Sequence, residues 1–281
     1  MSLAKAAVRR VGFIGLGSQG GPMARQIAES DFPTTLWARR AASLEPFADT
    51  TADVAASPAE LAAASDLVCV CVLGDADVEE VVAGPAGVLS GLAEGGVIAV
   101  HSTTHPDTCR RLAERAASQG VALLDAPVSG GGAAALERKL LVMVGGDASA
   151  VEACRPVFET YGSPVLYLGP VGSGQVAKLL NNLLMTANLG TAAATYALGN
   201  QLGVDLSALA DVFTHGTGRS FSASGPLPRA GFQLPVMGQH AGPLLQKDVR
   251  LLVELASAAG AETGAVLPAA DAALHQMNHP R

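Results

Sequence analysis

Short apolar runs alternate with helix-like segments from Val11 onward. The run Leu67–Val72 is apolar at every position, which is typical of a parallel strand buried on both faces. Ser57, which precedes a proline, and Pro106 are start signals for helices between such runs. The alternation predicts a doubly wound α/β domain over residues 1–168. The candidate strands are Val11–Ile14, Thr34–Trp37, Leu67–Val72, Val97–Val100, Val121–Leu124, Leu140–Val144 and Val165–Leu168.

The pattern becomes helical beyond this region and predicts an all-α domain over residues 169–281. A long helix at 174–202, ended by Gly203, opens this domain. Its faces are almost entirely apolar or small, which indicates burial at a domain or subunit contact. We therefore expect a homodimer or a homotetramer. Further helices are predicted at 205–214, 242–259 and 265–278, with a Gly/Ser/Pro-rich connection at 215–242.

Composition narrows the class of protein. Hydrophobic residues make up 49% of the 281 residues and charged residues 15%, enough apolar surface for a packed core. The net charge of −7 argues against a nucleic-acid partner, and no apolar stretch is long enough to predict a membrane span. The four cysteines lack metal-ligand spacing, so we expect buried thiols in a cytoplasmic protein. His101 and His105 are separated by a turn-like segment, and we expect no metal site.

A glycine-rich turn directly follows the first strand and opens a helix. Its first glycine permits the tight turn, the second lets the backbone approach a pyrophosphate, and the third lets the helix pack on the strand. The free N–H groups of the helix then face the diphosphate. This predicts a Rossmann dinucleotide site formed by Gly15, Leu16, Gly17, Ser18, Gln19 and Gly20.

The end of the second strand bears on the choice of dinucleotide. An NAD site usually has an acidic residue there, which accepts a hydrogen bond from the ribose 2′-hydroxyl. This chain instead has Arg39 and Arg40, and two guanidinium groups suit a 2′-phosphate. We expect NADP to be preferred, with NAD possible; the alternative is that one or both arginines are solvated loop charges.

Taken together, the motifs resemble the β-hydroxyacid dehydrogenase family, which includes 3-hydroxyisobutyrate dehydrogenase and tartronate semialdehyde reductase. They occur in the family's order and span nearly the whole chain. They are Gly15-Leu16-Gly17-Ser18-Gln19-Gly20-Gly21-Pro22-Met23-Ala24, Ser102-Thr103, Asp125-Ala126-Pro127-Val128-Ser129-Gly130-Gly131, Met143-Val144-Gly145-Gly146, Gly172-Ser173-Gly174-Gln175 with Lys178, Asn181 and Asn182, and Lys247-Asp248.

The resemblance implies roles for individual residues. Lys178 would be the general acid/base, and Asn182 would hydrogen-bond the reacting oxygen. A lysine early in an apolar helix suits this role, because burial of an ammonium tends to lower its pKa. The implied substrate-binding residues, which would hold a small carboxylate-bearing substrate, are Ser129, Gly130, Gly131, Asn181 and Lys247. Beyond the glycine motif and the two arginines, the implied cofactor-binding residues are Leu73, Thr103, Lys247 and Asp248.

The implied reaction is reversible oxidation of a small β-hydroxy acid to its semialdehyde or keto acid. An imine reductase shares the architecture but usually carries another residue in place of Lys178. A non-catalytic NADP-binding scaffold or sensor is the alternative from another class. The chain departs from the family pattern at Gln19, Val100, Ala194 and the loop 132–139. These departures argue against assigning one member's substrate.

Overall fold

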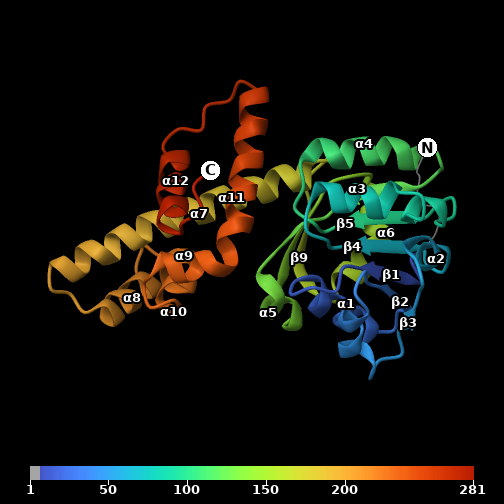
Figure 1. Cartoon of the computed structure of the whole chain (residues 1–281), viewed down its shortest axis with the longest axis horizontal. Coiled ribbons are helices and arrows are strands. Elements are labelled where there is room, and N and C mark those ends of the chain that lie inside the picture. Colours follow the sequence, from blue (N-terminus) through green and yellow to red (C-terminus); the bar gives the residue numbers. More distant parts are fainter. Residues whose placement is uncertain (1–6) are drawn as a thin grey trace. The chain divides into compact units, whose positions relative to one another are not determined.

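The computed structural model describes residues 7–281, so the first six residues of the predicted first domain lie outside the described part. Two compact units divide the chain, unit 1 at Met1–Lys178 and unit 2 at Leu179–Arg281 (Figure 1). The sequence placed the boundary ten residues earlier, where the strands end. The first turns of the long helix α7 (Ser173–Gln201) instead belong to unit 1.

Unit 1 is built on a six-stranded sheet in which all paired strands are parallel. The strand order is β3-β2-β1-β4-β5-β6, so the chain winds outward in both directions from β1. The predicted doubly wound α/β domain is therefore confirmed. The strands are β1 (Val11–Ile14), β2 (Thr34–Trp37), β3 (Asp53–Val54), β4 (Leu67–Val70), β5 (Val97–Val100) and β6 (Ala122–Asp125).

The central strands are buried on both faces, which explains their lack of polar alternation. In β4, Leu67 and Cys69 join one core cluster, and Val68 and Val70 join another. Helix residues complete both clusters: those of α1 and α6 pack on the first face and those of α2, α3 and α4 on the second. Figure 1 shows α3 and α4 on the same side of the sheet. The unit 1 helices are α1 (Gly20–Ala28), α2 (Pro58–Ala63), α3 (Asp75–Ala83), α4 (Pro106–Ala117), α5 (Gly131–Leu136) and α6 (Ala148–Phe158), with 3-10 turns η1 (Ala41–Ser43), η2 (Glu45–Phe47) and η3 (Val88–Ser90).

A second, three-stranded sheet follows the first. Its strands are β7 (Val128–Ser129), β8 (Leu140–Val144) and β9 (Gly162–Tyr167), with β7 antiparallel and β9 parallel to β8. The sequence pattern missed β3 and β7, because two residues are too few for any periodicity.

The regular secondary structure of the described residues of unit 2 is entirely helical. They are the remainder of α7, α8 (Leu206–His215), α9 (Phe221–Ser224), α10 (Pro226–Arg229), α11 (Leu234–Ala258) and α12 (Val266–Gln276). The structure corrects the predicted connection at 215–242, because the short helices α9 and α10 lie within it and α11 begins at Leu234 rather than at residue 242. In the sequence, the glycines of α11 look like helix breakers, but in the structure they allow other segments to approach the helix closely. A Cβ at Gly238 would collide with the backbone of Met277, and one at Gly242 with the ring of His279.

The core of unit 2 is centred on α7. The ring of Tyr196 packs 5.1 Å from that of Phe213 and 4.7 Å from that of Phe232, and its hydroxyl donates to the carbonyl of Ala223. Gly190 allows α12 to approach α7 closely, since a Cβ there would lie 2.6 Å from the carbonyl oxygen of Ala269. Within residues 7–281, no helix combines the length and apolar character needed to cross a membrane.

Candidate active site

The three motif glycines of the turn between β1 and α1 have different surroundings. Gly15 has φ +98°, and a Cβ there would collide with the carbonyl oxygen of Cys71. A Cβ at Gly20 would collide with the carbonyl oxygen of Gly15. A Cβ at Gly17, in contrast, would meet nothing within 4 Å. Protein packing therefore accounts for the first and third glycines, while the second leaves open space beside the backbone, which fits a diphosphate.

The remaining residues of this turn are partly or fully exposed. Leu16 and Gln19 are half-buried and Ser18 is exposed. Gln19 is the N-cap of α1 but makes no side-chain capping bond; its amide lies 3.6 Å from Sδ of Met23. The first N–H groups of α1 are thus not occupied by a capping side chain, as an anion site at a helix start requires.

Arg39 and Arg40 follow β2, and both are exposed. The Nη2 atom of Arg39 lies 3.0 Å from Oδ1 of Asp77 and 3.6 Å from Oε2 of Glu80, both on α3. Leu73, just after β4, is 78% exposed and is free to contact a ligand at the same edge of the sheet. No local pattern in the sequence indicates these ion pairs of Arg39.

The loop after β5 is tied to the end of β4. Ser102 is buried, and its Oγ accepts a hydrogen bond from the backbone N–H of Val72 at 2.8 Å. Thr103 follows and is half-buried. This bond places the segment carrying Thr103 beside the segment carrying Leu73.

Two buried side chains that sequence reasoning did not assign to the site anchor the start of α7. Asp125, at the end of β6, accepts hydrogen bonds from the backbone N–H groups of Gly172 (2.7 Å) and Gln175 (2.8 Å). The Gln175 side chain donates to the carbonyl of Ser102 (2.8 Å) and accepts from the N–H of Thr104 (3.1 Å). The first turn of α7 is therefore bonded to the ends of both β5 and β6.

Burial dominates the electrostatics of Asp125. Its side chain has no exposed surface, and desolvation raises its pKa to about 6 although backbone N–H groups favour the charged form. The sequence contains one sign that Asp125 anchors α7: an aspartate stands at the end of an apolar strand, within one of the motifs.

His101 is a buried part of the scaffold. Its Nδ1–H donates to the carbonyl of Ala126 (2.7 Å), so its Nε2 accepts from the hydroxyl of Tyr161 (3.2 Å). Burial lowers the pKa of His101 to about 4, and the ring is neutral at pH 7. Within residues 7–281, no group of three or more His, Cys, Asp or Glu side chains is arranged to hold a metal ion.

The predicted carboxylate-binding turn lies against the glycine-rich turn. Ser129 ends β7, and Gly130 and Gly131 follow with φ of +134° and +76°, which only glycine adopts readily. A Cβ at Gly132 would lie 2.5 Å from the carbonyl oxygen of Ser18. The structure therefore brings together, within unit 1, the segments predicted to bind cofactor and substrate.

Lys178 and the two asparagines lie on α7. Lys178 is half-buried, three residues after the anchored Gln175 and one helical turn before Asn182. Asn181 donates from its amide to Oδ1 of Asn182 at 3.1 Å. The predicted common face of these residues agrees with an unbroken helix over Ser173–Gln201.

A second polar cluster lies in unit 2. The Asn182 amide donates to Oδ2 of the buried Asp248 at 2.6 Å. Nζ of Lys247 lies 3.1 Å from Oδ1 of the same carboxylate. Amide, carboxylate and ammonium groups therefore form one chain of contacts. It joins Asn181 and Asn182 to Lys247 and Asp248, which lie more than 60 residues further along the sequence.

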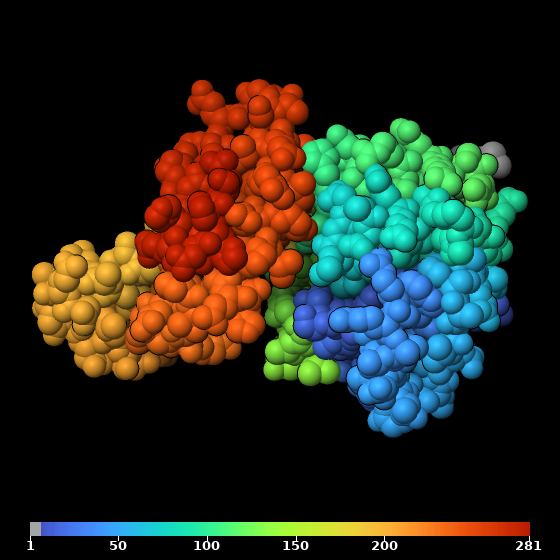
Figure 2. All heavy atoms as spheres, in the orientation of Figure 1, coloured from blue at the N-terminus to red at the C-terminus, as the bar shows by residue number. Residues whose placement is uncertain are grey.

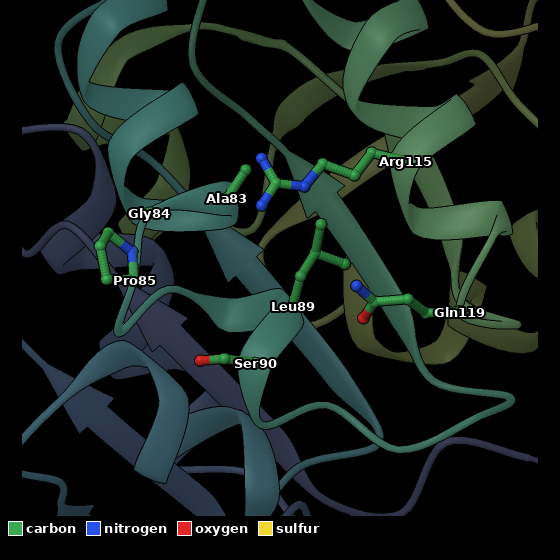
Figure 3. Close-up of a pocket in the computed structure, with 7 residues that line it drawn as sticks. All are labelled: Ala83, Gly84, Pro85, Leu89, Ser90, Arg115 and Gln119. Atoms are coloured by element: carbon green, nitrogen blue, oxygen red, sulfur yellow. The ribbon is translucent and has the colours of Figure 1, made fainter.

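A surface pocket of about 300 Å³ lies elsewhere in unit 1 (Figure 3). Figure 3 shows Arg115, near the end of α4, and Gln119, just after that helix, on one side, and Leu89 and Ser90 on the other, with Ala83 at the end of α3 above them. Helices of a doubly wound fold run opposite to the strands. The C-terminal ends of the helices therefore lie at the edge of the sheet away from the glycine-rich turn. This pocket is not part of the candidate active site.

Comparison with known proteins agrees with this geometry. The model of the NAD binding domain of 6-phosphogluconate dehydrogenase matches residues 10–169. The model described as NAD-binding of NADP-dependent 3-hydroxyisobutyrate dehydrogenase matches residues 172–279.

Individual relatives cover most of the chain. An NAD-dependent L-serine dehydrogenase of Pseudomonas aeruginosa is 33% identical over 91% of this chain and 88% of its own. Mitochondrial 3-hydroxyisobutyrate dehydrogenase of Mus musculus is 33% identical over 88% of this chain and 76% of its own. Among solved structures, Mycobacterium tuberculosis 3-hydroxyisobutyrate dehydrogenase with L-serine matches with a TM-score of 0.82 and 26% identity, over 96% of this chain and 94% of that one.

The family models and the named dehydrogenase relatives, together with a doubly wound domain that has a glycine-rich turn and is followed by a helical domain, identify an NAD(P)-dependent oxidoreductase that acts on CH–OH groups. The chain belongs to the β-hydroxyacid dehydrogenase family.

Proposed function

We propose that the protein catalyses reversible, NADP-preferring oxidation of a small β-hydroxy acid to its semialdehyde or keto acid. The observation that carries this proposal is the anchored start of α7. The hydrogen bonds that Asp125 accepts from Gly172 and Gln175, and the one that the Gln175 side chain donates to Ser102, fix the helix turn before Lys178 to the ends of β5 and β6. Those strand ends lie at the sheet edge where doubly wound folds bind dinucleotides.

Most of the proposed cofactor-binding residues lie in unit 1. The open backbone at Gly17 and the start of α1 would take the diphosphate, with Arg39 and Arg40 at the 2′-phosphate. Leu73 and Thr103 would line the nicotinamide end of the cofactor. Lys247 and Asp248 are the other proposed cofactor-binding residues. When bound, the nicotinamide accepts a hydride from the alcohol carbon or returns it.

The substrate carboxylate would bind the turn formed by Ser129, Gly130 and Gly131. Consecutive positive φ values expose backbone N–H groups there, and the serine adds a hydroxyl. Asn181 and Lys247 are the further proposed substrate ligands. Asn181 donates to the Asn182 side chain and Lys247 pairs with Asp248, so both carry polar groups of the kind that binds a carboxylate.

Lys178 would take the proton from the substrate hydroxyl during oxidation and return it during reduction. Asn182 would donate a hydrogen bond to the reacting oxygen. Its Nδ2 already donates to Asp248, and a primary amide has a second N–H for this purpose.

The relatives support a primary alcohol β to a carboxylate. L-Serine and 3-hydroxyisobutyrate, which appear in the names of two relatives, share this arrangement and differ in one small substituent. We therefore propose a substrate with a small group on the carbon between the alcohol carbon and the carboxylate.

We further propose a cytoplasmic homo-oligomer assembled through unit 2. Nine of the large apolar side chains that are exposed in the described structure lie there, including Leu180, Leu184 and Leu198 on α7. The end of α7 and α8 form the yellow-orange part of the surface in Figure 2. The four cysteines are free, which supports a reducing compartment. Sedimentation of wild type and Leu198→Glu would test whether this surface joins subunits.

A substrate panel tests the proposed activity. NADP⁺ reduction would be followed by its absorbance with 3-hydroxyisobutyrate, L-serine and D-glycerate, and with the methyl ester of each acid. We expect turnover of at least one acid and little of its ester, because the ester lacks the charge that the turn around Ser129 recognises. Oxidation of NADPH by cyclic imines, with no turnover of any acid, would indicate reduction of C=N bonds. Cofactor binding with no turnover in either direction would contradict the proposal.

A further inference from the structure

An ion pair reaches across the end of the central strand of unit 1. Arg39 follows β2, and Asp77 and Glu80 lie on α3, which follows β4. Because β2 and β4 flank β1 in the sheet, a contact between these segments passes over the carboxyl end of β1. The glycine-rich turn leaves the sheet at that same end.

This location is where a Rossmann fold receives the adenosine ribose. The residue following β2 meets the 2′-position, and the diphosphate lies on the turn after β1. The carboxylates of Asp77 and Glu80 therefore lie beside the guanidinium that a 2′-phosphate would use. They place negative charge beside the 2′-position of the adenosine ribose. At that position NADP has a phosphate with a charge of roughly −1.5 to −2, and NAD has an uncharged hydroxyl.

The other acidic residues of α3 are engaged elsewhere. Oδ1 of Asp75 accepts hydrogen bonds from the N–H of His105 (2.8 Å) and the hydroxyl of Thr108 (2.7 Å). Glu79 pairs with Arg111 of α4. Two acids of α3 therefore bind the α4 segment, and the other two pair with Arg39. Only the second two are expected to affect a ligand that binds Arg39.

Asp77 is the stronger of the two partners of Arg39. Its oxygen lies at hydrogen-bonding distance and its side chain is 29% exposed, whereas Glu80 is farther away and 73% exposed. An exposed carboxylate is largely screened by water, so most of the competition for Arg39 comes from Asp77.

We propose that Asp77 is a specificity-determining residue for the cofactor, which competes with the 2′-phosphate of NADP for Arg39 and so limits the preference for NADP over NAD. The proposal rests on the proposed binding of NAD(P) at the glycine-rich turn. NADP must displace Asp77 from Arg39 or accept an uncompensated carboxylate beside its phosphate. NAD leaves the ion pair intact, so the penalty falls on NADP alone.

The test is calorimetric titration of the full-length protein with NADP⁺ and with NAD⁺, without substrate, so that binding is measured apart from turnover. The variants are Asp77→Asn and, as matched control, Glu79→Gln, which removes one negative charge from the same helix without touching Arg39. We expect Asp77→Asn to tighten NADP⁺ binding about three- to tenfold, with NAD⁺ changed less than about twofold. Glu79→Gln should change the ratio of the two dissociation constants by less than about twofold.

Two further measurements sharpen the test. Glu80→Gln should shift the ratio in the same direction by a smaller factor, and about 0.5 M salt should reduce the effect of Asp77→Asn. Arg39→Ala should weaken NADP⁺ binding by about tenfold or more and leave NAD⁺ nearly unchanged. An unchanged NADP⁺ affinity in Arg39→Ala would overturn the proposal, because Asp77 would then have no phosphate ligand to compete for.

The outcomes separate this proposal from the proposed function. If wild type binds neither dinucleotide, the proposed cofactor site fails and the role of Asp77 fails with it. If wild type binds both and Asp77→Asn leaves the ratio unchanged or lowers it, only the role of Asp77 is overturned. Thermal melting of each variant confirms that the compared proteins are folded.

Discussion

Two buried aspartates, one in each unit, differ in the partners that surround them. Asp125 in unit 1 is bonded to the backbone N–H groups of Gly172, just before α7, and of Gln175, in its first turn. Asp248 in unit 2 is held by two side chains, the amide of Asn182 and the ammonium of Lys247. A backbone-bonded carboxylate fixes a scaffold, whereas a carboxylate held by side chains can orient groups that exchange partners with a ligand.

The largest expected change in stability comes from Asp125→Ala. Two buried N–H groups would lose their acceptor and the start of α7 its cap, at a cost of about 3 to 5 kcal/mol in unfolding free energy. Asp147→Ala is the control, since Asp147 caps α6 through Ser149 and Ala150 at the surface and should cost about 1 kcal/mol. Urea denaturation measures both. Equal losses would remove the distinction between a buried scaffold carboxylate and an ordinary cap.

The pH dependence of stability should show two opposing contributions from unit 1. Burial lowers the pKa of His101 to about 4, so the unfolded chain binds a proton that the folded chain does not, and stability falls as the pH drops from about 6.5 to 4. Burial raises the pKa of Asp125 to about 6, so the folded chain keeps a proton that the unfolded chain has released, and stability falls as the pH rises from about 4 to 6.

Single variants separate the two contributions. Between pH 6.5 and 4.5, His101→Gln should lose about 2 to 3 kcal/mol less stability than wild type, and Asp125→Asn should lose more than wild type. Urea denaturation at the two pH values gives the differences. Parallel profiles for all three proteins would mean that neither pKa is shifted in the folded state.

Asp248→Asn should affect activity more than stability. The variant keeps the shape of the side chain but removes the negative charge that pairs with Lys247, so we expect a loss of about 1 to 2 kcal/mol in stability and about tenfold in kcat/KM. Asp271→Asn, which removes the partner of Arg281 in the same unit, should leave kcat/KM unchanged. A loss of stability as large as that of Asp125→Ala, with kcat/KM intact, would assign Asp248 to the scaffold.

Gly17→Ala should change stability least of all. A Cβ at this position meets no atom within 4 Å, so we expect less than about 0.5 kcal/mol in unfolding free energy but a loss of about tenfold or more in NADP⁺ affinity. Gly20→Ala, whose Cβ would collide with the backbone of Gly15, is the contrasting variant and should impair folding. Denaturation and calorimetric titration measure the two effects, and unaltered NADP⁺ affinity in Gly17→Ala would place the diphosphate elsewhere.

Features that depend on neighbouring residues were predictable from the sequence. The longer strands of the main sheet, the glycine-rich turn and the common face of Lys178 and Asn182 all follow from local spacing. The bond between Gln175 and Asp125 joins residues 50 apart, and no local pattern marks such a pair. The ion pair of Arg39 with Asp77 depends on the strand order, which a pattern of apolar runs does not specify. The roles assigned to the individual site residues stay predictions.

The most direct test of the account is the comparison of Lys178→Met with wild type. Turnover would be measured with the best acid of the substrate panel, and NADP⁺ affinity by calorimetry on the same proteins, with Lys139→Met as a control for loss of an exposed lysine paired with Glu137. The account predicts that Lys178→Met lowers kcat by about 10² to 10⁴ while NADP⁺ affinity stays within about twofold. A kcat within tenfold of wild type, with the fold and the cofactor affinity intact, would contradict it, because the proton would then be transferred by another group.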